Sequence, residues 1–155
     1  MWFEVDVNGI NIKLQIYGYK QTNKDNCFDE WCKCDFKFTS GAWLNYHKEN
    51  DEILLSFEVK QLDETLTKLL TNELSEIKEM VCMEPDFIFE FYPQTDIRNK
   101  PNYCYVKPGS EIQDIYMEWK IFFWNEGITD NHLTISLGRK EIIMLRDYLL
   151  EVIKG

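Results

Sequence analysis

The sequence predicts a single α+β domain over residues 1–155, with a largely antiparallel sheet of about eight strands and two amphipathic helices. Several short segments alternate apolar and polar side chains, which is the period of a strand with one buried face. An Asn-Gly pair joins the first two of these segments, and two later segments space their apolar residues as a helix does. The pattern is compatible with both one curved sheet and a sandwich.

The N-terminal segments WFEVDV and INIKLQIYGY predict a β-hairpin around Asn8-Gly9. A two-residue type I′ turn needs positive φ at both central residues, and Asn-Gly accepts this best. The turn pairs Val7 with Ile10, and alternate residues outward from it are apolar on both strands. The apolar side chains then share one face: Phe3, Val5, Val7, Ile10, Ile12 and Leu14.

A polar stretch over 18–30 predicts a surface loop, and 31–38 (WCKCDFKF) alternates as a strand. One face of that strand carries Cys32, Cys34, Phe36 and Phe38. Zinc sites use cysteine pairs about two to four residues apart, together with a second pair. Here the spacing is one residue, and the remaining cysteines (Cys27, Cys82 and Cys104) form no second close pair. We therefore predict buried free thiols, with no metal site and no cofactor.

Residues 40–51 predict a turn and a short edge strand, and 52–59 (EILLSFEV) predict a further strand. The segment from Gln61 to about Glu79 predicts a helix. Its core-facing stripe is Leu62, Leu66, Leu69, Leu70, Leu74 and Ile77. Glu73 falls near this stripe, so either the helix ends or bends before it, or Glu73 lies at the boundary of a contact surface.

The second half of the chain predicts strands at 87–91, 115–124 and 132–137 and a helix from about Lys140 to Ile153. Residues 93–114 predict a long irregular loop, in which YCYV at 103–106 supplies at most a short strand. A weak similarity between SFEVKQLDETLTKLL (56–70) and SLGRKEIIMLRDYLL (136–150) favours two meander-plus-helix halves, although chance also explains it.

The net charge of −10 is concentrated in one part of the chain, because residues 51–90 hold 11 acids against Lys60, Lys68 and Lys78. Nucleic acids and anionic membranes require clustered Lys and Arg, so neither is expected as the main partner. The acids instead suit a basic partner, or they serve only to keep the protein soluble.

No catalytic pattern is present in the sequence. The two histidines, His47 and His132, lie in no ligand-spaced or catalytic motif, and no nucleophile elbow, zinc-protease, P-loop or dinucleotide signature occurs. The chain is therefore not expected to be an enzyme. The N-terminus has acids and no basic region before an apolar run, and no apolar run could span a bilayer, so we expect a cytoplasmic protein.

Four short motifs in order resemble the WapI family of small bacterial immunity proteins. They are the Asn8-Gly9 hairpin running into IYGY (16–19), then DEW (29–31), then SGAW (40–43), followed by an acidic, leucine-rich helix and a C-terminal strand and helix. The resemblance implies a cytoplasmic antitoxin that blocks the toxic C-terminal domain of a polymorphic or contact-dependent toxin, often a nuclease. It implies no catalytic residues.

A basic toxin domain, expected to be a nuclease, would meet the acidic part of this chain. The candidate contacts are Asp51, Glu52, Glu64, Glu73, Glu76, Glu79, Glu84 and Asp86. The alternative function is a domain that binds a small molecule or carbohydrate through sheet aromatics and the loop at 93–114. An accessory subunit of a larger assembly is a third possibility, which the sequence does not separate from the first.

Overall fold

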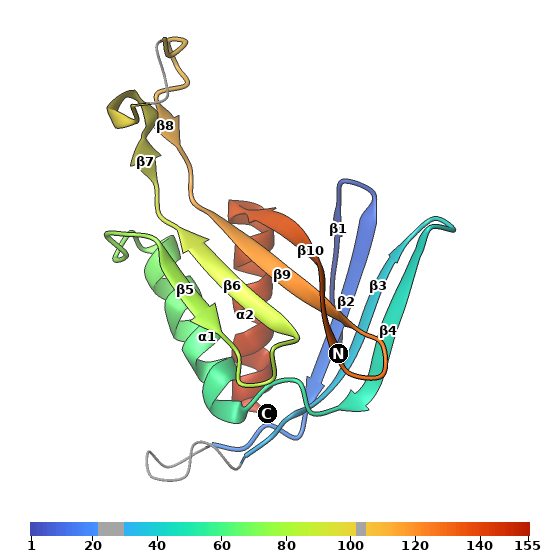
Figure 1. Cartoon of the computed structure of the whole chain (residues 1–155). Helices are drawn as coiled ribbons and strands as arrows, with labels where there is room; N and C mark the ends of the chain where they lie inside the picture. The colour runs from blue at the N-terminus through green and yellow to red at the C-terminus, as the bar shows by residue number, and fades with distance from the viewer. Residues whose placement is uncertain (22–29, 102–104) are drawn as a thin grey trace.

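The computed structural model describes residues 1–21, 30–101 and 105–155. Its elements form two four-stranded antiparallel sheets, a two-stranded ribbon and two long helices, which confirms the predicted α+β class (Figure 1). The two sheets are separate, and each is a meander of strands that are neighbours in sequence order apart from the inserted ribbon. A helix follows each sheet, so the prediction of two meander-plus-helix halves is also confirmed.

The first sheet has the order β1-β2-β3-β4. Its strands are β1 (Phe3–Val7), β2 (Ile10–Tyr17), β3 (Lys33–Ser40) and β4 (Leu44–Asp51). Val7 pairs with Ile10 and Phe3 with Leu14, as the Asn-Gly turn predicts. Asn8 and Gly9 both have positive φ, at 51° and 84°. The edge strand β4 is longer than the sequence suggested.

The prediction of a strand over 52–59 is wrong. Helix α1 (Ser56–Leu70) begins inside that segment, and Leu55 makes only an isolated bridge to Trp31. A short apolar run is compatible both with a buried strand and with the buried residues that lead into a helix, so hydrophobic periodicity does not distinguish the two structures. Glu58 stabilises the start of the helix, because its carboxylate accepts the backbone N–H of Leu55 at 3.1 Å. This is the capping interaction of a glutamate in the first helical turn.

Helix α1 also ends earlier than the predicted Glu79. Thr71 caps it, Asn72 adopts the left-handed conformation with φ 59°, and the Glu73 N–H donates to the Lys68 carbonyl. The alternative that the helix ends before Glu73 is thus confirmed. Strand β5 (Lys78–Val81) begins inside the segment that was predicted as the last turn of this helix.

The second sheet has the order β10-β9-β6-β5. Besides β5 it comprises β6 (Phe87–Tyr92), β9 (Tyr116–Trp124) and β10 (Ile128–Gly138). Between β6 and β9 the chain forms the ribbon of β7 (Thr95–Asp96) and β8 (Ile112–Gln113), with a 3₁₀ turn at Ile97–Asn99. This ribbon extends away from the body (Figure 1) and corrects the prediction of an irregular loop over 93–114. The predicted short strand at 103–106 falls half outside the described ranges, and its described residues 105 and 106 are not in a strand. Most of the polar stretch at 18–30 also falls outside those ranges.

Helix α2 (Arg139–Lys154) follows β10 directly. Residues 56–70 are helical throughout, whereas 136–138 still belong to β10, so the similar segments of the sequence are not structurally equivalent. The two helices pack against each other on one face of the second sheet, and no helix of the described part of the chain lies over the other face (Figure 1).

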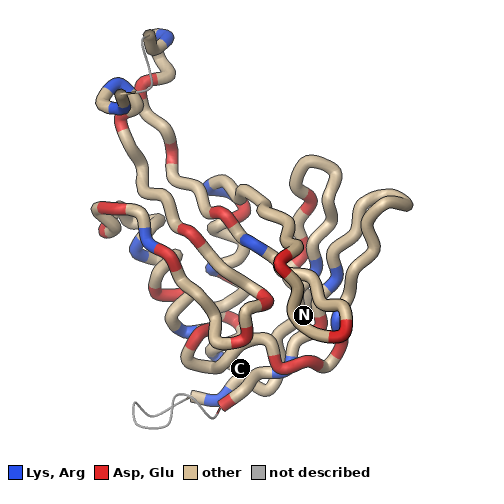
Figure 2. Tube along the Cα trace, in the orientation of Figure 1, with Lys and Arg blue, Asp and Glu red and all other residues tan. Residues whose placement is uncertain are grey.

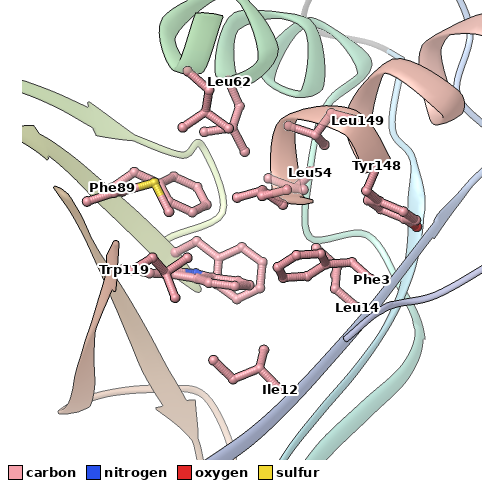
Figure 3. Close-up of a cluster of buried hydrophobic side chains, with 14 of the residues drawn as sticks. Phe3, Ile12, Leu14, Leu54, Leu62, Phe89, Trp119, Tyr148 and Leu149 are labelled. Carbon is pink, nitrogen blue, oxygen red and sulfur yellow. The ribbon is translucent and has the colours of Figure 1, made fainter. Parts of the chain in front are cut away.

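One buried cluster joins both sheets and both helices (Figure 3). Phe36 on β3 contacts Phe87 on β6 and Trp119 on β9, with ring centroids 5.2 and 5.9 Å apart. The hydroxyl of Tyr148 on α2 accepts the N–H of Ile16 on β2 at 2.8 Å. The inner faces of the two sheets therefore meet through aromatic side chains, which contribute about 0.5–1.5 kcal/mol per ring pair beyond their buried area.

In the described ranges, no helix has the length and apolar character needed to cross a membrane.

Three cysteines confirm the prediction of core thiols. Cys32, Cys34 and Cys82 are buried and unpaired, and burial raises the pKa of each thiol above its usual value. Because the thiolate is the reactive species, we expect iodoacetamide to leave these three cysteines unmodified in the native protein and to modify them in urea. Peptide mass spectrometry separates them from Cys27 and Cys104, which lie outside the described residues. Native labelling of Cys34 at the rate of a free thiol would contradict this expectation.

Candidate partner-binding surface

The structure distributes the eight candidate acids over three places. Four of them gather around a hollow at the turn end of the β5–β6 hairpin, one lies on the open face of the second sheet, and three lie on α1 or on the connection from α1 to β5. Figure 2 shows acidic residues recurring along β5, β6 and β9 and on that connection.

The hollow has a volume of about 170 Å³ and is lined by two basic or aromatic residues and four acids. These residues are Lys48, Trp124, Asp51, Glu52, Glu84 and Asp86. The structure thus brings together candidate acids from the end of β4 and from the β5–β6 turn, which lie more than 30 residues apart in the sequence.

Lys48 connects acids from the two ends of this hollow's lining. It pairs with Phe36 across the first sheet, so its side chain projects from the inner face toward the second sheet. Its Nζ donates to Asp51 at 2.7 Å and to Asp86 at 2.8 Å, and it lies 4.3 Å from the centroid of the Trp124 ring. Burial alone would lower the pKa of Lys48, but the two carboxylates outweigh it and hold that pKa above its usual value.

Asp86 is a buried structural residue and is not exposed to a partner. Only 4% of its side chain is accessible, and its carboxylate is taken by Lys48. Burial would raise the pKa of Asp51, but the hydrogen bond and charge of Lys48 hold that pKa below its usual value. Of the four acids around the hollow, Glu52 is exposed, although Lys33 pairs with it at 3.1 Å, and Glu84 is half-buried.

Glu79 belongs to a row of three glutamates across the open face of the second sheet. It stands opposite Glu90 on β6, and Glu90 stands opposite Glu118 on β9. Like charges in directly opposed positions are destabilising. Lys120 relieves part of this repulsion by donating to Glu90 at 2.6 Å.

Two tyrosines adjoin this row. The rings of Tyr92 and Tyr116 stack at 4.4 Å, and the Tyr92 hydroxyl donates to Glu90. The hydrogen bonds from Lys120 and then from Tyr92 hold the pKa of Glu90 below its usual value, and the same bond to Glu90 raises the pKa of Tyr92. Glu90 is therefore fixed as a carboxylate on this face.

The remaining three candidates are exposed but do not join a cluster. Glu64 lies in the middle of α1, and Glu73 and Glu76 lie on the connection to β5. The Thr71 hydroxyl donates to Glu73 at 2.9 Å. In the described ranges no group of three or more His, Cys, Asp and Glu side chains is placed to hold a metal ion.

A comparison with protein families matches residues 4–149 to the Immunity protein WapI-like family. The chain belongs to this family. The match covers almost the whole chain and includes both sheets and most of α2. No curated protein matches the sequence.

Sequence reasoning missed two acids of the open face, Glu90 and Glu118. The signal that could have found them is strand parity, because each lies between buried residues of an alternating segment and so faces outward. Which acids stand opposite each other depends on strand register, which no turn signal in 93–114 fixes.

The alternative function predicted a ligand site formed by sheet aromatics and the loop at 93–114. A hollow of about 670 Å³ lies between the N-terminal residues and α2, and its lining includes Met1, Trp2, Met144 and Tyr148. Among the described residues, none of those that line this hollow comes from the loop at 93–114, which the sequence had made part of the ligand site.

Proposed function

We propose that this protein is an antitoxin that binds the toxic C-terminal domain of a polymorphic or contact-dependent bacterial toxin and blocks it stoichiometrically in the cytoplasm. The family match over residues 4–149 carries this proposal. The protein then acts by occupying the toxin and has no catalytic residues of its own.

The proposed partner is a basic domain, such as a nuclease with a phosphate-binding cleft. The charge distribution supports this, because the exposed acids Glu64, Glu73, Glu76 and Glu79 lie in the part of the chain that holds most of the net negative charge. Electrostatic steering raises association rates toward about 10⁸–10⁹ M⁻¹s⁻¹, against about 10⁵–10⁶ M⁻¹s⁻¹ for an unsteered encounter. Fast association suits a protein that must neutralise a toxin before it acts.

Co-expression with the toxin C-terminal domain encoded immediately upstream tests the function. We expect growth to be rescued by the wild-type protein, and the purified pair to form a complex of fixed stoichiometry. Continued toxicity together with no detectable complex would contradict the antitoxin function.

The acidic docking surface has a separate kinetic test. We expect Glu76→Lys with Glu79→Lys to reduce the association rate about 10-fold at low salt and to flatten its salt dependence. Asp147→Lys with Glu151→Lys is the matched control, because it changes the net charge equally at two exposed positions on α2. If the two double variants reduce the association rate equally in stopped-flow measurements, the rate depends on net charge and not on the position of the acids, which would contradict the docking surface.

A further inference from the structure

Strand β5 (Lys78–Val81) and the residues that flank it carry exposed apolar side chains, and in the described ranges no helix covers the outer face of this strand (Figure 1). Ile77, Val81 and Met83 are 63%, 57% and 54% exposed, and Glu79 lies between them. The intervening residues Met80 and Cys82 are buried in the core. We call the outward residues Ile77, Glu79, Val81 and Met83 the β5 strip.

The strip continues across the open face of the second sheet. Val81 stands opposite Ile88, and Glu79 stands opposite Glu90, whose own neighbour is Glu118. Both helices pack on the other side of this sheet (Figure 1). The open face therefore combines a group of exposed aliphatic side chains with a row of carboxylates, whereas isolated exposed apolar residues would need no explanation.

Two contacts join β5 and the residue that follows its end by two positions to α1. The Met83 N–H donates to the buried carboxylate of Glu58 at 3.0 Å, and Lys78 reaches the Thr65 hydroxyl at 3.5 Å. Both contacts come from α1 on the inner side of the sheet, so they leave the outer face of the strip accessible.

We infer that the β5 strip is the apolar centre of the toxin-binding interface, and that its partner is an aliphatic or aromatic patch surrounded by Lys and Arg. This rests on the proposed antitoxin function. Charge complementarity favours a basic occupant, because Glu79, Glu90 and Glu118 lie among or beside the apolar side chains and Lys120 forms its ion pair with Glu90. In protein interfaces the apolar centre sets the dissociation rate, while charges around it set the association rate.

The test replaces the apolar side chains and leaves every acid in place. We expect Ile77→Ser, Val81→Thr and Met83→Gln together to weaken binding of a catalytically inactive toxin domain about 100-fold, mainly through faster dissociation. Ile128→Thr, Ile143→Ser and Met144→Gln are the matched control, since these apolar residues are also exposed but lie off the strip. The control should bind within about 3-fold of the wild type. Because all six positions are exposed, both variants should keep the wild-type urea midpoint.

The outcomes separate the inference from the function. If the wild type binds and rescues growth while the strip variant binds within about 3-fold of it, the strip is not the interface centre and the antitoxin function stands. If the wild type neither binds nor rescues, the function fails and the inference fails with it. Sedimentation of the free protein tests whether a second copy of this chain binds the strip instead. If the wild type self-associates, the strip variant does not, and toxin binding is unchanged, the strip is a contact between copies and the inference is overturned.

Discussion

Replacing Lys48 by methionine is expected to lower the free energy of unfolding by about 3–5 kcal/mol, because it leaves a buried carboxylate without its partner. Asp86 is 4% accessible, and Lys48 Nζ lies 2.8 Å from it. Methionine keeps the length of the apolar stem and removes the charge. Urea denaturation followed by tryptophan fluorescence measures the change.

Lys33 provides the control for this prediction. It pairs with Glu52 at a similar distance of 3.1 Å, but both side chains are about half exposed, at 42% and 50%. Exposed pairs contribute about 0–1 kcal/mol, so Lys33→Met should leave the urea midpoint almost unchanged. Adding Asp86→Asn to Lys48→Met should recover part of the lost stability, since the uncompensated charge is then removed. Equal effects of Lys48→Met and Lys33→Met would show that Asp86 is solvated after all.

Replacing Glu58 by alanine is the second large effect, with an expected loss of about 2–5 kcal/mol. The carboxylate accepts the N–H of Leu55 at the start of α1 and the N–H of Met83 after β5. Alanine leaves both donors without an acceptor, and an unsatisfied buried donor costs about 1–3 kcal/mol. Glu58→Gln should cost less, because its single carbonyl oxygen still serves one of the two donors. A loss for alanine no larger than that for glutamine would contradict this account.

Glu58 also gives stability a pH dependence of known sign. Burial raises the pKa of this carboxyl above its usual value, so the folded state holds the proton more tightly than the unfolded chain does. The resulting contribution to stability is complete below the unfolded pKa and is lost as pH rises through the folded pKa. Glu58→Gln does not titrate, so the stability of the wild type relative to this variant should decrease over that interval. An increase over the same interval would contradict the sign.

Local signals predicted the elements whose structure depends on near neighbours. The Asn8-Gly9 turn fixed the register of β1 and β2, and alternation identified the buried faces of β3, β6 and β9. The segment over 52–59 failed because three consecutive apolar residues, Ile53, Leu54 and Leu55, carry no period. The last turn of the predicted α1 failed because Ile77 continued a helical stripe that the chain had already left at Asn72.

The candidate site was harder to predict, because it depends on how the two sheets meet. Nothing local separates Asp86 from the exposed acids around it, and its burial follows from the approach of Lys48 out of the other sheet. The grouping of Glu79 with Glu90 and Glu118 follows from strand order. The sequence correctly indicated which part of the chain is acidic. It did not indicate that this part also holds exposed apolar side chains on the same face.

The aromatic contact between the sheets has a consequence for synthesis. Phe36 on β3 is covered by Phe87 and Trp119, and Ile16 on β2 is bonded by Tyr148 on α2. On the ribosome, the first sheet therefore emerges with its apolar face exposed to water, and that face is closed only after the C-terminal helix has been made. The two sheets can therefore pack as described only in the finished chain, and under the proposed antitoxin function only finished copies can bind the toxin.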